Sequence, residues 1–447
     1  MIFVVVVARV LGPERFGIYA LVLATVEMLA VASGTGYMDY LTREAAKDER
    51  VGWGLWAQLI WLRLGCIVPV VAAGLGGLWL LGYPRPVIAA AAWLLLTLIP
   101  RSLSETVQGV LRGIGRYIES LVVELAFGIG LIAGAGLLVL RGGGVYRVIE
   151  AELIAAGVAA LGGLVFALRF RAKDPLYLRF RQLLNTSAIF NVYAFVGNLY
   201  DRLDIVLLSK LAGNYATGVY SAAYRPIGTF QLLPYGVLYS LLPTMSRGGG
   251  AQVERERIEK VMGLLLSASL GIVLTTMVFA NVAVPLFLGA RFAESATALK
   301  MLIWAVIPRY LNYALNTRLL AGGHEKVFVA TSLVCLVVNV IGNIVLIPIF
   351  SWKAAAVLTI VTEAALLAQN VYWVRRAGGF FPMPLGWARI STVFVALMLS
   401  MFAGERVASP LSIGSACLLF FVFYLYRSGM AGEFATAWRT EREILET

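Results

Sequence analysis

Apolar residues occupy this chain in long runs that short polar segments separate. Runs of about 20 apolar residues, the length of helix that spans a bilayer, recur from one end to the other. The pattern predicts an all-α polytopic membrane protein with about fourteen transmembrane helices. The first apolar run, 1–10, is shorter than a spanning helix, so we expect helix 1 to be incomplete.

The chain contains an internal repeat with a constant offset of 201 positions. Five positions of one segment match five of the other in residue type: Arg9, Gly12, Gly17, Tyr19 and Ala20 against Lys210, Gly213, Gly218, Tyr220 and Ser221. A weaker match pairs 111–116 with 320–325. Both halves begin on the same side of the membrane, which predicts parallel repeats related by an axis along the membrane normal.

The repeat divides the chain into two pseudo-symmetric six-helix lobes and two further helices. The predicted parts are an N-lobe at 1–168 (helices 1–6), a basic cytoplasmic linker at 169–186, a C-lobe at 187–374 (helices 7–12), helices 13 and 14 in 375–427, and a cytoplasmic tail at 428–447. The linker mixes basic and aromatic residues. It is either an amphipathic helix on anionic headgroups or an ordinary basic loop.

The charge follows the membrane topology. The composition is 60% hydrophobic and 14% charged, with a net charge of +12, whereas a soluble domain is about 25% charged. The loops on one side of the predicted spans contain roughly three times as many Arg and Lys residues as those on the other. The bias predicts a multi-pass protein of the cell inner (cytoplasmic) membrane with its C-terminus in the cytoplasm. The net positive charge therefore gives no reason to expect a nucleic-acid partner.

The residues that enzymes need for chemistry are sparse. One histidine makes a zinc site implausible, and three cysteines within apolar spans indicate packing. The sequence has no G-x-x-x-x-G-K-[ST] segment for nucleotide phosphates and no nucleophile–base pair in a polar domain. We expect no enzyme activity, no metal and no cofactor.

Ionisable residues inside apolar segments are candidate functional groups, because placing charge in lipid is costly. Asp201, Arg202 and Asp204 form the densest group, and Arg225 directly precedes Pro226, which weakens a helix locally. Two interpretations stay open for each. The charges either neutralise one another or snorkel as part of packing, or they orient cations that line a cavity.

Four segments have the residue order of a known family. They are R-x-L-G-P-E-x-F-G-x-Y at 9–19, T-R-E-x-A at 42–46, D-x-x-x-L at 204–208 and G-x-Y-x-x-A-x-R at 218–225. This order resembles polysaccharide biosynthesis flippases of the O-antigen and exopolysaccharide type, a branch of the multidrug/oligosaccharidyl-lipid/polysaccharide exporter superfamily. The segment 339–348 is also similar, with Asn339 and Asn343 expected to bond across helices. The chain departs from the pattern at 351–353, where glycine is usual.

The resemblance implies two lobes around a central cavity and the export of a polyprenyl-pyrophosphate-linked oligosaccharide by alternating access. Arg suits pyrophosphate because its guanidinium binds two phosphate oxygens at once. The candidate cavity cations are Arg9, Arg43, Arg202, Arg225 and Arg318. The candidate sugar contacts are Tyr19, Tyr200, Tyr220 and Tyr224, and the candidate ion-coupling residues are Glu27, Glu124, Asp204 and Glu363. The implied partners are the lipid-linked substrate, membrane lipids and polysaccharide polymerase or assembly proteins.

Three other functions stay open at this point. A multidrug antiporter for organic cations would share the fold but favour an acidic cavity. A peptidoglycan lipid-precursor flippase would differ only in its substrate. A scaffold for a polymer-synthesis complex would not need the arginines for export.

Overall fold

A computed structural model describes residues 2–35, 37–172, 175–177, 180–237, 251–378, 380–404 and 410–427. These residues form helices joined by short turns, and they contain no strand. The all-α prediction is therefore confirmed. The predicted tail 428–447 and parts of the predicted linker lie outside the described residues.

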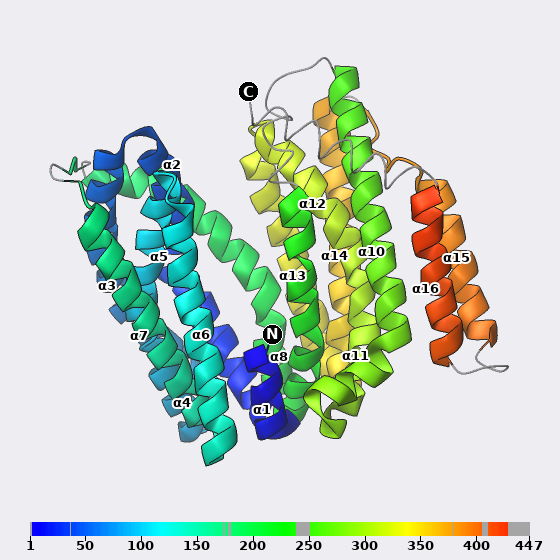
Figure 1. Ribbon diagram of the computed structural model, residues 1–447, viewed down its shortest axis with the longest axis horizontal. Helices are drawn as coiled ribbons and strands as arrows, with labels where there is room; N and C mark the ends of the chain where they lie inside the picture. The colour runs from blue at the N-terminus through cyan, green and yellow to red at the C-terminus, as the bar shows by residue number, and fades with distance from the viewer. Residues whose placement is uncertain are drawn as a thin grey trace. The chain divides into compact units, whose positions relative to one another are not determined.

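Two compact units make up the chain, residues 1–221 and 222–447. The elements of the first unit are α1 (Ile2–Ala30), the π-helical segment η1 (Val31–Thr35), α2 (Tyr37–Lys47), α3 (Glu49–Leu80), α4 (Arg85–Leu95), α5 (Leu98–Gly113), α6 (Tyr117–Arg141), α7 (Val145–Phe170) and most of α8 (Phe180–Phe230). Helix α7 packs against α5 and α6, and α5 also packs against α3 (Figure 1). One buried cluster of the unit, including Leu41, Trp53 and Val107, joins α2, α3 and α5.

The second unit begins in the last part of α8. Its further elements are α10 (Ala251–Leu288), the 3-10 segment η2 (Ala290–Phe292), α11 (Ala293–Leu302), the 3-10 segment η3 (Ile303–Ala305), α12 (Val306–Ala321), α13 (Glu325–Phe350), α14 (Trp352–Gly378), α15 (Trp387–Gly404) and α16 (Pro410–Arg427). Helices α12 and α13 pack against α14, and the α15–α16 pair packs against α10 (Figure 1).

Within the described residues, eight helical stretches are long and apolar enough to cross a membrane. Shorter apolar helices lie at Trp387–Met401 and Leu411–Arg427. Helix α13 has exposed Val337, Ile341 and Val345 at helical spacing. A row of large exposed apolar side chains is stable against lipid and unfavourable in water. The structure thus agrees with a polytopic membrane protein, and the total of about fourteen helices stays a prediction.

The two repeated glycines give the chain the same backbone break twice. Gly12 has φ 70° and ψ 171°, and Gly213 has φ 84° and ψ 177°. Only glycine adopts this combination without strain, because it has no Cβ. The break at Gly12 divides α1 into two helical segments, and the break at Gly213 divides α8 in the same way. The shared geometry supports the predicted repeat.

The segments that follow the two breaks touch each other through a second pair of repeated glycines. A Cβ added to Gly17 would lie 1.8 Å from the carbonyl oxygen of Asn214, and one added to Gly218 would lie 1.9 Å from that of Pro13. Each glycine therefore faces the residue directly after the other segment's break. Backbones can approach this closely only where side chains are absent.

This packing explains why the compact units divide inside α8. Arg202 of α8 forms an ion pair with Glu27 of α1 at 2.8 Å, and Gly218 contacts α1 as well. Most of α8 therefore belongs to the first unit. The predicted lobes 1–168 and 187–374 are a different division, based on the repeat, and they stay a prediction.

Ser351 is a strained residue at the turn between α13 and α14. Its φ of 53° and ψ of −138° lie in a region that strongly favours glycine. A serine thus occupies a backbone conformation suited to glycine.

We expect Ser351→Gly to stabilise the protein by about 1 kcal/mol, because the relief of strain exceeds the entropy that glycine loses on folding. The measurement is the apparent melting temperature in mild detergent. Ser351→Ala is the matched control, since it removes the hydroxyl but keeps the Cβ. Equal melting temperatures for the two variants would contradict the strain.

Candidate functional site

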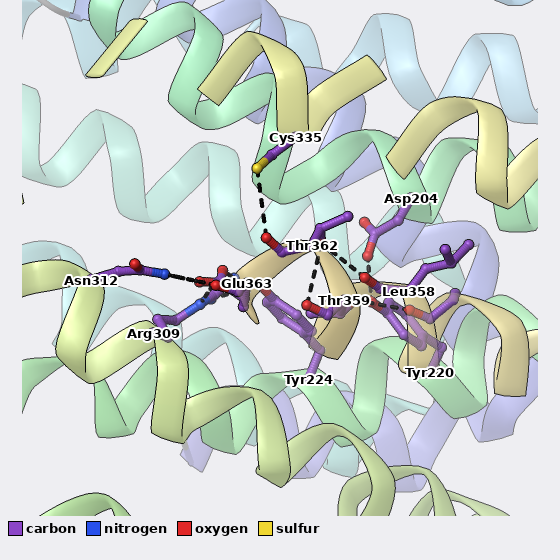
Figure 2. A network of polar contacts seen from close by, with 11 residues as sticks. Asp204, Tyr220, Tyr224, Arg309, Asn312, Cys335, Leu358, Thr359, Thr362 and Glu363 are labelled. Carbon is purple, nitrogen blue, oxygen red and sulfur yellow. Dashed lines mark hydrogen bonds and ion pairs between the residues drawn. The ribbon is translucent and has the colours of Figure 1, made fainter. Parts of the chain in front are cut away.

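Buried ionisable groups gather in the second unit around Glu363 of α14. Its Oε1 lies 2.7 Å from Nη2 of Arg309 and accepts a hydrogen bond of 2.8 Å from Nε. Its Oε2 accepts from Nδ2 of Asn312 at 3.1 Å, and Asn370 donates to Asn312 at 3.0 Å. Figure 2 shows the carboxylate of Glu363 between Arg309 and Asn312. A buried ion pair is tolerable when hydrogen bonds satisfy its remaining atoms, as they do here.

Tyr224 of α8 joins the same network. Nη1 of Arg309 donates to the hydroxyl oxygen of Tyr224 at 2.9 Å, and the guanidinium carbon lies 5.8 Å from the ring centroid. Tyr224 is buried. Tyr224 therefore bonds Arg309, which also pairs with Glu363. The role of Tyr224 as a sugar contact stays a prediction.

A second group of ionisable residues lies in the first unit around Glu152 of α7. The Tyr19 hydroxyl donates to Oε1 of Glu152, and Nη2 of Arg101 lies 4.0 Å from Oε2. One helical turn after Arg101 on α5, Glu105 pairs with Arg63 of α3 at 2.9 Å. Tyr19, Arg63 and Glu152 are buried. These contacts connect α1, α3, α5 and α7 through charge and hydrogen bonds.

The two groups have the same plan. The tripeptide Ile-Pro-Arg occurs at 99–101 and again at 307–309. In each copy the arginine pairs with a glutamate farther along the chain, Glu152 in one unit and Glu363 in the other. A tyrosine from the segment after a glycine break completes each group. We did not predict Glu152 as a site residue from the sequence. The repeated Ile-Pro-Arg tripeptide could have identified its partner, Arg101.

Asp204 is buried and bonded within α8. Oδ2 of Asp204 accepts from the hydroxyl of Tyr220, and Oδ1 accepts from the backbone N–H of Ile205 at 2.8 Å. The bond from Tyr220 connects the two segments of α8 across the break at Gly213 (Figure 2). The hydrogen-bond partner of Asp204 is therefore a tyrosine, while Arg202 pairs with Glu27.

Arg43 lies on α2 in an exposed position, with 53% of its side chain accessible. It donates to Glu44 at 3.2 Å, and Lys47 donates to the same oxygen at 2.8 Å. Burial raises the pKa of Glu44, but the hydrogen bonds from Lys47 and Arg43 outweigh it and hold that pKa below its usual value. Glu44 is thus ionised at neutral pH, and it neutralises part of the local positive charge.

The other predicted residues lie in separate places. Arg9 is exposed, three positions before the break at Gly12. Arg225 and Arg318 are half-buried on α8 and α12, and Tyr200 is half-buried on α8. Glu124 of α6 is 65% exposed and pairs with Arg112 at 3.2 Å. Arg9 lies inside the candidate span Ile2–Gly34, and Arg43 lies after that span, on α2.

The asparagines of α13 differ from their prediction. Nδ2 of Asn343 donates to Oδ1 of Asn339 at 2.8 Å, so the two residues bond each other along one helix. The four-residue spacing places them on the same face, which makes this bond available without a partner helix. In the described part of the chain, no group of three or more His, Cys, Asp or Glu side chains is arranged to hold a metal.

Glu363→Gln should destabilise the protein by about 3 kcal/mol or more, because the Arg309 charge would stay buried without its counterion. The double change Arg309→Gln and Glu363→Gln should cost less than the sum of the two single changes. Apparent melting temperatures in detergent measure both. Arg255→Gln is the control, since Arg255 forms an exposed pair on α10 worth about 0.5 kcal/mol. Additive effects of the two buried changes would contradict the pairing.

Residues 1–248 match the family model described as polysaccharide biosynthesis protein. The chain is 21% identical over 401 residues to a probable low-salt glycan biosynthesis flippase, Agl15, of Haloferax volcanii, which covers 88% of this chain and 84% of that protein. It is 27% identical over 277 residues to the succinoglycan biosynthesis transport protein ExoT of Rhizobium meliloti, which covers 60% of this chain and 53% of that protein.

Solved structures share the fold. An inward-facing multidrug resistance MATE family transporter of the MOP superfamily aligns with a TM-score of 0.70 at 16% identity, over 84% of this chain and 93% of that one. The lipid II flippase MurJ in an inward closed conformation aligns with a TM-score of 0.68 at 14% identity, over 94% of this chain and 97% of that one. The fold is thus that of these transporters. Because the family model covers more than half of the residues, the chain belongs to the polysaccharide biosynthesis protein family.

Proposed function

We propose that this protein is a flippase that exports a polyprenyl-pyrophosphate-linked oligosaccharide across the cytoplasmic membrane by alternating access. Membership of the polysaccharide biosynthesis protein family supports the class of substrate. Two relatives with glycan-export names, Agl15 and ExoT, support it as well. The fold supports the type of motion, because solved neighbours are described in inward-facing and outward-facing conformations.

The surroundings of Arg225 give the strongest support for a diphosphate substrate. It is half-buried in the long helix α8, and among the described residues it has neither a hydrogen bond nor an ion pair. An arginine at membrane depth without a counterion is unfavourable unless an anionic ligand or water reaches it. A diphosphate offers such a ligand, since a guanidinium can bind two of its oxygens.

In this proposal, several arginines bind the negatively charged diphosphate in turn. Arg43 is exposed and binds the diphosphate first, on the cytoplasmic side. Arg202 and Arg225 then replace the water that the phosphates lose in the membrane, and Arg318 contributes from α12. The candidate sugar contacts are Tyr19, Tyr200, Tyr220 and Tyr224. The hydroxyls of Tyr19, Tyr220 and Tyr224 can bind a sugar only if they exchange their present hydrogen bonds.

Glu27 is the ion-coupling candidate that the geometry favours. Its carboxylate pairs with Arg202 at 2.8 Å, and both side chains are about a quarter exposed. A proton or cation on Glu27 would weaken this pair and release Arg202 for phosphate. Asp204 and Glu363 are buried, and Glu124 pairs with Arg112, which is not a candidate phosphate ligand, so these three remain weaker candidates.

The topology follows from the positive-inside rule. The side with more Arg and Lys is the cytoplasm, so the C-terminus is cytoplasmic and the membrane is the inner one. The substrate enters from that side. Polymerase or assembly proteins that receive the saccharide on the outer side are the expected protein partners.

One alternative has specific support from the fold. A multidrug transporter is among the structural neighbours, and it would take organic cations instead of a diphosphate. The candidate residues here include five arginines, a charge that repels organic cations. A peptidoglycan lipid-precursor flippase, suggested by the MurJ neighbour, would use the same cations on a different saccharide.

Arg43→Ala and Arg225→Ala should each abolish export while the protein level in the membrane is unchanged. Each change removes a cation that offsets the desolvation of the diphosphate. The measurements are the surface polysaccharide of cells and mass spectrometry of lipids that co-purify in mild detergent. Polyprenyl-diphosphate saccharides should accompany the unchanged protein and be lost from both variants.

Arg255→Ala is the control, because Arg255 is an exposed arginine already paired on α10. Retained export in both test variants would overturn the cation proposal. Co-purification of organic cations in place of diphosphate lipids would favour the drug antiporter.

A further inference from the structure

Two arginines of the first unit contact one aromatic ring where α6 begins and α7 ends. The guanidinium carbon of Arg116, in the turn before α6, lies 4.2 Å from the ring centroid of Phe170, the last residue of α7. That of Arg169 lies 5.4 Å from the same centroid. The two guanidinium carbons therefore lie within about 10 Å of each other. With small movements of the side chains, one phosphate group can accept hydrogen bonds from both.

Packing fixes the position of this ring. Phe170 stacks on Phe166 with ring centroids 6.2 Å apart, and both rings pack against the buried cluster of α2, α3 and α5. The chain beyond α7 is held as well, because the N–H of Leu176 donates to the carbonyl of Arg50 at 3.0 Å. Residues 171, 172 and 175–177 are not helical, so this described part of the predicted linker is not an amphipathic helix.

The charges at this end of the unit are not balanced. Arg116 is 49% exposed and pairs with Glu119 at 3.1 Å. Arg169 and Arg171 are exposed, and neither forms an ion pair with another described residue. The positive-inside rule accounts for the number of cations on this side of the predicted topology. It does not account for the placement of two of them against one ring, which holds their charges together.

Exposed apolar side chains begin directly beside these cations. Tyr117, Ile118 and Leu121 are exposed on α6, and Val165 and Leu168 are exposed on α7. Such side chains are stable against acyl chains and unfavourable in water, and a tyrosine at the start of the apolar segment is typical of a membrane interface. A ligand with an anionic head and apolar tails matches both parts of this surface.

We propose that Arg116 and Arg169 bind the headgroup phosphate of an anionic phospholipid, whose acyl chains lie against the exposed apolar side chains of α6 and α7. The phosphate oxygens accept hydrogen bonds from both guanidiniums, and Arg171 adds positive charge nearby. A zwitterionic headgroup is disfavoured, because its own cation is repelled by the arginines. The proposal concerns lipid binding alone and does not rest on the proposed export of a saccharide.

The test measures lipid retained by the full chain in mild detergent, by native mass spectrometry with added phosphatidylglycerol or phosphatidylcholine. The unchanged protein should retain phosphatidylglycerol in preference to phosphatidylcholine. Arg116→Gln and Arg169→Gln should each weaken phosphatidylglycerol binding about fivefold, and the double variant about thirtyfold, since each cation at a membrane surface contributes a similar amount. Undiminished binding in the double variant, or equal retention of the two lipids by the unchanged protein, overturns the proposal.

Arg50→Gln is the matched control. Arg50 is an exposed arginine at the same end of the unit, and it already pairs with Asp48 at 3.5 Å. Its loss should leave phosphatidylglycerol binding unchanged. An equal loss of binding in this control overturns the site, because general surface charge would then be responsible. Apparent melting temperatures without added lipid show which variants fold, and the single variants decide the test if the double variant does not.

Two competitors separate the possible sources of the phosphate. Inorganic phosphate at millimolar concentration should not displace phosphatidylglycerol, because it has no acyl chains to place against α6 and α7. Displacement by inorganic phosphate would indicate a site for the free ion and overturn the proposal. Displacement by a polyprenyl-diphosphate saccharide at far lower concentration than by phosphatidylglycerol itself would assign the arginines to the exported substrate and overturn it too. Since transport is not measured, failure of the proposed export leaves this test unaffected.

Discussion

The arginine–glutamate pair is the interaction on which the described helices most depend. A charge inside a membrane needs a partner, and in each unit an arginine after an Ile-Pro dipeptide finds a glutamate from a helix farther along the chain. The pair in the second unit is shorter and better bonded, at 2.7 Å against 4.0 Å. Tyr19 of α1 bonds the glutamate of the first pair, and Tyr224 of α8 bonds the arginine of the second. Each pair thus also holds the helical segment that follows one of the glycine breaks.

The glycine breaks give the chain a second constraint. They turn the backbone where lipid would penalise an irregular segment, and they bring Gly17 and Gly218 into a contact that no larger residue permits. The ion pair of Arg202 with Glu27 joins the same two helices, so both close backbone packing and charge hold α1 against α8.

Much of the fold was predictable from local pattern. Apolar runs predicted helices, and the break at Gly12 falls at a Gly-Pro dipeptide, so both features have signals within a few adjacent residues. The pairing of side chains was less predictable. Glu152 meets Tyr19 across 133 positions, and no local spacing encodes that distance. Asn343 bonds Asn339 within its own helix, because residues four apart are neighbours on one helix face. The roles of the predicted arginines depend on a substrate and stay predictions.

We propose that this protein recognises its lipid-linked substrate chiefly by the diphosphate. The most direct measurement is competition in reconstituted vesicles, where movement of a labelled polyprenyl-diphosphate saccharide is followed while unlabelled lipids are added. We predict that a polyprenyl diphosphate without sugar competes well, that a neutral polyprenol does not, and that organic cations have no effect. Equal competition by the neutral polyprenol, or inhibition by organic cations alone, would contradict the account.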